Sequence, residues 1–174
     1  MASAPETLTL VEHRDRRGRR WHVWVRRGAL ALVALVPVLA LLNVFGQRPA
    51  TTSAASGAAR LQIYAPAHAR SGLVYAARFR VDAIRELKKG MLILAPGWAE
   101  QYTVNGIAPQ PVSEGSDDGK LLFDLGHVRR GEHYTLFVSL QVNPTNVGHR
   151  PQTVWLYDGT QQLLVVHRTI TIWP

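Results

Sequence analysis

The sequence predicts an all-β antiparallel sandwich that is preceded by one transmembrane α-helix. An apolar run ends close to residue 46, and from residue 60 onward short stretches of alternating apolar and polar residues follow one another. Alternation with a period of two is typical of strands that bury one face. Turn signals between these stretches favour a sandwich of short strands. We therefore divide the chain into a basic tail (1–27), a transmembrane helix (28–46), a flexible linker (47–59) and an outer β-sandwich domain (60–174).

The apolar run is unbroken from residue 29 to residue 42 and reaches residue 46 past one asparagine. A helix that rises 1.5 Å per residue needs about 20 residues to cross the hydrocarbon core of a bilayer. Lipid offers no hydrogen-bond partners to the backbone, so a spanning segment must be helical. Residues 28–46 therefore predict a membrane-spanning helix, with a kink expected at Pro37.

The charges around the apolar run predict its orientation. Seven arginines precede the run, whereas only Arg48 lies just after it. Basic residues close to a spanning segment stay in the cytoplasm, which places the N-terminus inside and the C-terminal domain outside the plasma membrane. Indole rings are favoured at the headgroup level. The predicted membrane anchor consists of Arg19, Arg20, Trp21, Trp24, Arg26 and Arg27.

A cleaved signal peptide is the alternative interpretation of this region. A basic segment, an apolar core and the small residues at 54–58 are its ingredients. The run is longer than the roughly 7 to 15 apolar residues that are usual for such peptides, and the small residues lie well beyond its end. These features favour the anchor. Cleavage would make the outer domain a secreted binding protein.

The outer domain contains two clear alternating stretches, at residues 73–81 and 134–142. Only residues 83–89 favour a short helix, and the acidic segment 113–119 is expected to be a hairpin loop. The linker is rich in small and polar residues without apolar periodicity, which is typical of a flexible stalk. Further strands are predicted at 61–64, 91–95, 100–104, 120–124, 153–157 and 163–172.

A glycine turn leads into the second alternating stretch, where Gly131 is followed by Tyr134. This segment resembles the corner before the penultimate strand of bacterial immunoglobulin-like domains, in which a tyrosine hydroxyl bonds the backbone upstream. The resemblance implies an immunoglobulin-like β-sandwich, with Tyr134 as the corner tyrosine. The arginine-rich, alanine-rich and cysteine-free composition also resembles that of proteins from high-GC bacteria. The fold itself implies no particular function.

No catalytic signature is present in the sequence. There are no cysteines, and the histidines of the outer domain lack the spacing of metal ligands. We therefore expect no catalytic residue, metal site or cofactor. The aromatic residues Trp98, Trp155 and Tyr157 are the candidate binding surface, with Trp155 and Tyr157 on one face of a strand.

These features predict a non-enzymatic, single-pass protein of the cell envelope. The net charge of +8 comes largely from the tail, so the expected contacts of these arginines are with the lipid bilayer and not with nucleic acid. The outer sandwich is expected to bind a protein partner in the envelope or to serve as a subunit of a membrane complex. Binding of wall glycan or a small ligand is the alternative.

Overall fold

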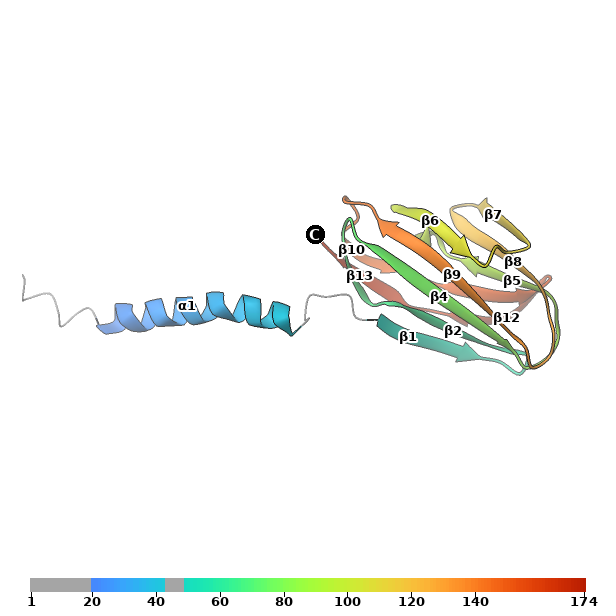
Figure 1. Cartoon of the computed structure of the whole chain (residues 1–174), viewed down its shortest axis with the longest axis horizontal. Coiled ribbons are helices and arrows are strands. Elements are labelled where there is room, and N and C mark those ends of the chain that lie inside the picture. Colours follow the sequence, from blue (N-terminus) through green and yellow to red (C-terminus); the bar gives the residue numbers. More distant parts are fainter. Residues whose placement is uncertain (1–19, 43–48) are drawn as a thin grey trace, which may run out of the picture. The chain divides into compact units, whose positions relative to one another are not determined.

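The computed structural model describes residues 20–42 and 49–174 of the chain. Contacts divide the chain into two units, Met1–Val44 and Phe45–Pro174. Among the described residues, the first contains helix α1 (Arg20–Leu41) and the second contains a β-domain (Figure 1).

Helix α1 begins earlier than the predicted span, because residues 20–27 continue the helix on its N-terminal side. Three of these residues are arginines, which favour helix, so the helical backbone extends beyond the apolar run. Pro37 lies inside the helix. The described side chains of residues 21–42 are exposed, apart from the half-buried Leu39. Residues 43–46, the end of the predicted span, lie outside the described residues.

The first five-stranded sheet, sheet A, is antiparallel throughout. Its central strands contain the two stretches with the clearest alternation in the sequence. In spatial order its strands are β1 (Pro49–Ala55), β2 (Ala59–Pro66), β4 (Val74–Ala83), β9 (His133–Val142) and β6 (Tyr102–Ala108).

The second five-stranded sheet, sheet C, faces sheet A, and its hydrogen-bonded neighbours are also antiparallel. Its strands in spatial order are β12 (Gln161–Val166), β11 (Val154–Asp158), β5 (Leu87–Leu94), β8 (Lys120–Val128) and β7 (Ser113–Asp117). A small sheet B contains β10 (Gly148–Pro151), β13 (Thr169–Trp173) and β3 (His68–Arg70), with β13 and β3 parallel.

The core lies between sheets A and C and is filled by alternate residues of their strands. On β4, for example, Tyr75, Ala77, Phe79 and Val81 are buried while their neighbours in sequence face outward. The 3₁₀ turn η1 (Pro96–Trp98) inserts Trp98 into this core, where its ring packs edge-on against Phe79 with a centroid distance of 5.1 Å. Two facing sheets with this alternation form the predicted immunoglobulin-like β-sandwich.

Four local predictions are wrong. The acidic segment 113–119, which was expected to be a hairpin loop, forms strand β7 over Ser113–Asp117, and only Asp118 and Gly119 make the turn. The linker predicted at 47–59 contains strand β1, which pairs with β2 from Pro49 to Ala55. Its residues are small, but every second one is half-buried, so backbone pairing rather than hydrophobicity holds the strand. The segment 83–89, which was predicted to be helical, contains the end of β4, a bend at residues 84–86 and the start of β5, because sheet pairing overrides helix propensity. The strand predicted at 163–172 is broken at residues 167–168 into β12 and β13.

The corner before β9 forms as the resemblance implies, but without its hydroxyl brace. Gly131 has φ of +83° and turns the chain into β9, where Tyr134 packs against the core. Within residues 20–42 and 49–174 the Tyr134 hydroxyl makes no hydrogen bond. The glycine turn therefore makes this corner without help from the tyrosine.

Candidate functional site

Trp98 is not a surface residue. Its side chain is 0% exposed, so the prediction that it contributes to a binding surface is wrong. The turn η1 directs it inward, and the guanidinium of Arg168 lies 5.4 Å from the centre of its ring. A Pro-Gly turn in front of a tryptophan does not reveal from the sequence alone whether the ring points into or out of the sandwich.

Trp155 and Tyr157 do share one face of a strand. Both lie on β11, alternate with the buried Val154 and Leu156, and are half-buried on the outer face of sheet C. The Tyr157 hydroxyl donates a hydrogen bond of 3.0 Å to Oε1 of Gln162 on the neighbouring strand β12. This bond fixes the tyrosine ring beside the tryptophan.

Apolar side chains continue from Trp155 across the sheet. The register pairs Trp155 with Val165 on one side and with Ile93 on the other, and Ile93 is in turn paired with Leu122. All are half-buried. Side chains paired in this way lie on the same face of a sheet. We name the resulting surface the apolar face of sheet C, and it consists of Met91, Ile93, Leu122, Trp155, Tyr157 and Val165.

A shallow hollow of about 270 Å³ lies on this face. It is lined by Ile93, Lys120, Trp155 and Tyr157. Lys120 places a cation at the edge of the hollow. At another edge of the apolar face, Nζ of Lys89 lies 4.0 Å from Oδ2 of Asp124. On a sheet face that contacts water, the outward-facing residues of each strand are normally polar. The outer face of sheet A follows that rule more closely, because β4 exposes Arg78 and Arg80 there.

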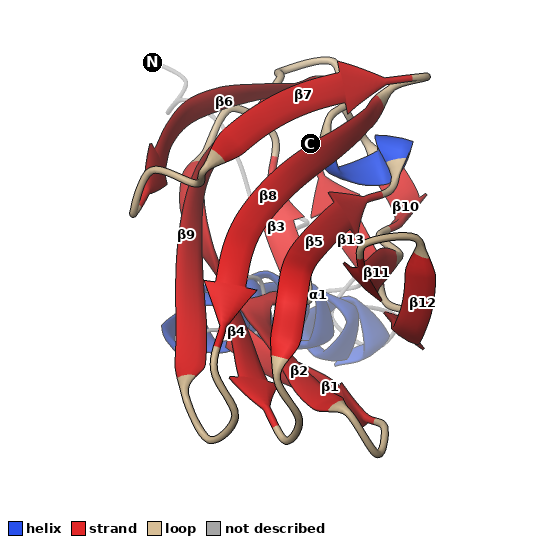
Figure 2. Ribbon diagram, turned by 90° about the vertical axis from the view of Figure 1, so that its right-hand side faces the viewer, coloured by secondary structure: helices blue, strands red, loops and turns tan. Residues whose placement is uncertain are grey.

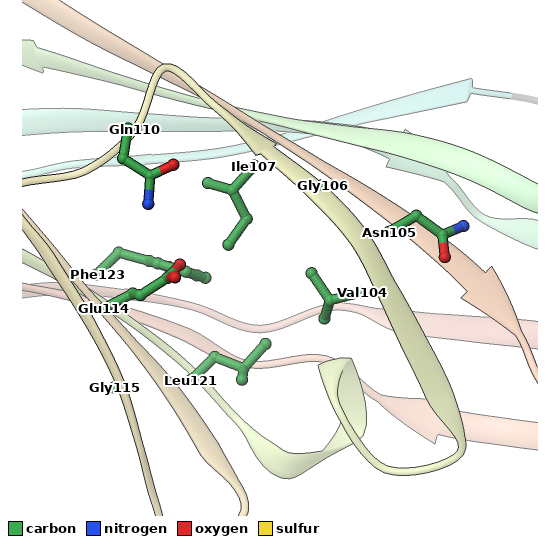
Figure 3. Close-up of a pocket in the computed structure, with 9 residues that line it drawn as sticks. All are labelled: Val104, Asn105, Gly106, Ile107, Gln110, Glu114, Gly115, Leu121 and Phe123. Carbon is green, nitrogen blue, oxygen red and sulfur yellow. The ribbon is translucent and has the colours of Figure 1, made fainter.

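A second hollow, which the sequence did not predict, lies between β6 and the β7–β8 hairpin. Its volume is about 440 Å³. Its apolar walls are Val104 and Ile107 of β6 and Leu121 and Phe123 of β8 (Figure 3). Glu114 of β7 directs its carboxylate toward this space (Figure 3). We name this hollow the edge groove, because β6 and β7 are the last strands of their sheets.

A polar cluster lies inside the sandwich around Arg168. One of its terminal nitrogens, Nη2, donates to the backbone oxygens of Ala65 and Pro66, at 3.3 and 2.6 Å. Burial lowers the pKa of this guanidinium below its ordinary value. The hydroxyl of Tyr75 accepts a hydrogen bond of 3.4 Å from Gln152, and burial raises the pKa of both Tyr75 and Tyr102. These contacts join strands β2 and β4 of sheet A to the segments at Gln152 and Arg168, which connect sheets B and C, so the cluster has a structural role.

The predicted anchor residues lie on α1 wherever the structure describes them. Trp21 and Trp24 are 65% and 71% exposed, and the Arg27 guanidinium lies 5.8 Å from the centre of a Trp24 ring. Arg26 is also exposed. The backbone of Arg20 begins the helix, and Arg19 lies outside the described residues. Among described residues one helical segment, Trp21–Leu41, is long and apolar enough to cross a membrane.

Within the described residues, no group of three or more histidine, aspartate or glutamate side chains is arranged to hold a metal ion. His127 contacts Glu86 at 2.7 Å on the surface, and His149 and His167 each contact a threonine hydroxyl. Three of the five histidines of the outer domain therefore have side-chain partners other than a metal ion.

The fold and these surfaces define a β-sandwich module that follows an apolar helix. No protein-family model matches the chain, and no curated protein matches its sequence. Among solved structures it is similar to a non-cellulosomal cohesin from Archaeoglobus fulgidus, with 11% identity and a TM-score of 0.39 over 73% of this chain and 92% of the cohesin. It is also similar to a superoxide reductase (neelaredoxin) from Ignicoccus hospitalis, with 13% identity and a TM-score of 0.35 over 65% of this chain and 79% of that one. Both likenesses are too distant to indicate a ligand or a reaction.

Proposed function

We propose that this chain is a membrane-anchored binding protein whose outer β-sandwich docks a protein partner through the apolar face of sheet C. One observation carries the proposal: a row of apolar side chains, including Trp155, crosses four neighbouring strands on an outward face. A contiguous apolar patch on the surface of a soluble domain often marks an interaction site, whereas single exposed apolar residues are ordinary.

The composition of this face fits a protein partner. Tryptophan, tyrosine and methionine are enriched at protein interfaces, and charged residues are depleted at the centre of such interfaces. Here Trp155, Tyr157 and Met91 lie centrally, while Lys89 and Lys120 lie at the edge. Trp155 is therefore the expected hot spot, with a loss of about 2 kcal/mol of binding free energy on truncation to alanine.

The helix supports the anchored part of the proposal. A helix that is apolar on all sides needs either a protein core or lipid around it. The side chains of α1 are almost all exposed, including Leu32 at 70% and Val33 at 66%. Lipid would bury them, and the arginines before the apolar run favour an inside N-terminus. The outer domain would then work at the external face of the plasma membrane.

Site-specific photocrosslinking of the full chain in its native cells tests this function. A photoreactive phenylalanine analogue replaces Lys120, at the edge of the hollow, or Arg80, which is exposed on sheet A. We expect the Lys120 probe to capture one protein in near-stoichiometric amounts. The Arg80 probe should capture much less of that protein.

The same experiment with Trp155→Ala decides whether the face itself binds. The affinity for the partner should fall about thirtyfold, which corresponds to the expected loss of about 2 kcal/mol, and capture from Lys120 should fall with it. Capture that is unchanged by this substitution, or equal from both probes, would refute docking through this face. Crosslinking to wall glycan in place of protein would favour the glycan-binding alternative, since the hollow between Trp155 and Tyr157 could also hold a sugar ring.

A further inference from the structure

The edge groove opens on one side of the sandwich only. On the other side the outermost strands of sheets A and C meet, since β12 contacts both β1 and β2. On the groove side β6 and β7 are the outermost strands, and both lie along the same margin of the domain (Figures 1 and 2). At the hollow of about 440 Å³ between them, the edge of the hydrophobic core is therefore open to solvent.

The floor of this groove is apolar. The register pairs Glu114 with Phe123 and Ser116 with Leu121, so these four side chains share the inner face of sheet C. Val104 of β6 projects toward them from sheet A (Figure 3). Phe123 is 2% exposed, whereas Val104 is 38% exposed. An apolar side chain placed above this floor would be shielded from water on two sides.

Strand β7 offers free hydrogen-bonding groups beside this floor. The Asp118-Gly119 turn has φ of +47° and +72°, which is a two-residue turn of the type that pairs Asp117 with Lys120 through backbone hydrogen bonds. Hydrogen-bonded and non-bonded pairs alternate along an antiparallel ladder. The backbone N–H and C=O groups of Glu114 and Ser116 are therefore directed away from β8, toward the open margin.

The margin is also negatively charged. Within residues 20–42 and 49–174, Glu114, Asp117 and Asp118 form no ion pair, although a lysine, Lys120, lies on the same hairpin. The carboxylate of Glu100 lies beside the turn, because a Cβ added at Gly119 would come within 3.8 Å of its Oε1. Lys120 is directed to the outer face of sheet C, where it lines the hollow near Trp155.

We propose that the edge groove binds an extended, basic segment of a partner protein, which adds as a strand to β7. An apolar side chain of that segment opposite Ser116 would cover the half-buried Leu121, and a lysine or arginine two positions away would lie opposite Glu114. This is a second surface, separate from the apolar face of sheet C, and it does not depend on the function proposed above.

The charge of β7 decides between the possible occupants. Strand addition needs an extended backbone, for which the free groups of Glu114 and Ser116 supply partners. A second copy of this chain would bring its own acidic β7 to the same edge, and like charges directly opposite each other are destabilising. A basic strand is attracted by the negative charge of β7, so its association rate should depend strongly on salt concentration.

Selection from a phage-displayed library of random nonamer peptides tests this proposal. The target is the full chain in nanodiscs, at low and at physiological salt. We expect enrichment of peptides with Lys or Arg two positions from an apolar residue, because side chains opposite Glu114 and Ser116 would share the inner face of sheet C. No enrichment, or enrichment without basic residues, would overturn the proposal, as would dimerisation of the chain through β7.

Two variants then locate the enriched peptides on the groove. Glu114→Lys should weaken the affinity about tenfold, mainly through slower association, and should reduce the salt dependence. Glu132→Lys makes the same charge change in the loop between β8 and β9, and it should leave the affinity unchanged. Equal effects of the two substitutions would show a non-specific charge attraction and refute the groove.

Ser116→Pro tests the strand pairing itself. It removes an N–H that is directed away from β8, so the hairpin should keep its own hydrogen bonds. We expect about tenfold weaker peptide binding without a change in the thermal unfolding midpoint. Peptide binding that survives this substitution would overturn strand addition. Trp155→Ala should leave peptide binding intact, which separates this site from the apolar face of sheet C.

Discussion

The guanidinium of Arg168 lies 5.4 Å from the centre of a Trp98 ring inside the β-sandwich. Arg168 is 9% exposed, and within the described residues neither its Nε nor its Nη1 atom has a hydrogen-bond partner in the protein. Its Nη2 atom joins the end of β2 to the break between β12 and β13. This one side chain therefore connects sheet A to the segment that passes from sheet C to sheet B.

Substitution of Arg168 should separate the contribution of its volume from that of its charge. Arg168→Ala removes the stacking on Trp98 and leaves two backbone oxygens unpaired, which we expect to cost about 3 kcal/mol of unfolding free energy. Arg168→Met fills the space without burying a charge and should cost less than half of that. Urea unfolding of the full chain in micelles, followed by near-ultraviolet circular dichroism, measures both. Equal losses would mean that the charge itself stabilises the domain.

Stability should fall at alkaline pH because of two buried tyrosines. Burial raises the pKa of both Tyr75 and Tyr102 above the ordinary value of about 10. Their neutral forms are favoured in the folded state, so this contribution is fully present below pH of about 10 and is lost as pH rises above it. Between pH 10 and 11 we expect a loss of about 1 kcal/mol of unfolding free energy from Tyr102, whose pKa is strongly raised, and a further loss from Tyr75. Urea unfolding across this range measures the loss.

Tyr102→Phe supplies the matched control for this pH dependence. Within the described residues the Tyr102 hydroxyl has no hydrogen-bond partner, so its removal should leave the stability at pH 8 nearly unchanged. It should also remove about 1 kcal/mol of the alkaline loss, which is the contribution of Tyr102. An alkaline loss that is unaffected by Tyr102→Phe would assign the effect to other groups.

Gly97 is required by close packing between η1 and sheet B. A Cβ at this position would fall on the carbonyl oxygen of Pro151, which belongs to the backbone of β10 and cannot rotate away. We expect Gly97→Ala to lower the unfolding free energy by about 3 kcal/mol, as overpacking against backbone does. At Gly106 a Cβ would meet no heavy atom within 4 Å. Gly106→Ala should therefore be nearly neutral in the same urea titration, and similar losses at both positions would contradict this explanation.

The sequence predicted the strands that bury large apolar side chains and missed those that do not. Alternation over residues 134–142 is clear because Leu136, Val138, Leu140 and Val142 all face the core. Strand β1 contains alanine, threonine and serine, so hydrophobicity alone cannot distinguish it from a linker. The break at residues 167–168 was also hidden, because both flanking segments are apolar and only their pairing with different sheets separates them.

The candidate surfaces were predictable to different degrees. Trp155 and Tyr157 are two residues apart on a strand, so their common face follows from the geometry of any β-strand. Their neighbours Ile93 and Leu122 come from strands that are distant in the sequence, and only the register brings them together. The edge groove was not predicted, because it depends on which strands end the two sheets.

The orientation of the chain can be measured by the labelling of single cysteines, since the natural sequence has none. With the N-terminus in the cytoplasm, a membrane-impermeant maleimide applied to intact cells should label Ser116→Cys, on the exposed strand β7, and not Ser3→Cys. Val154→Cys, at 0% exposed, is the control for burial and should react only after denaturation. Labelling at Ser3 would reverse the proposed orientation. Release of a shortened, soluble product would instead identify the apolar segment as a cleaved signal peptide, because a retained helix keeps the outer domain with the membrane fraction.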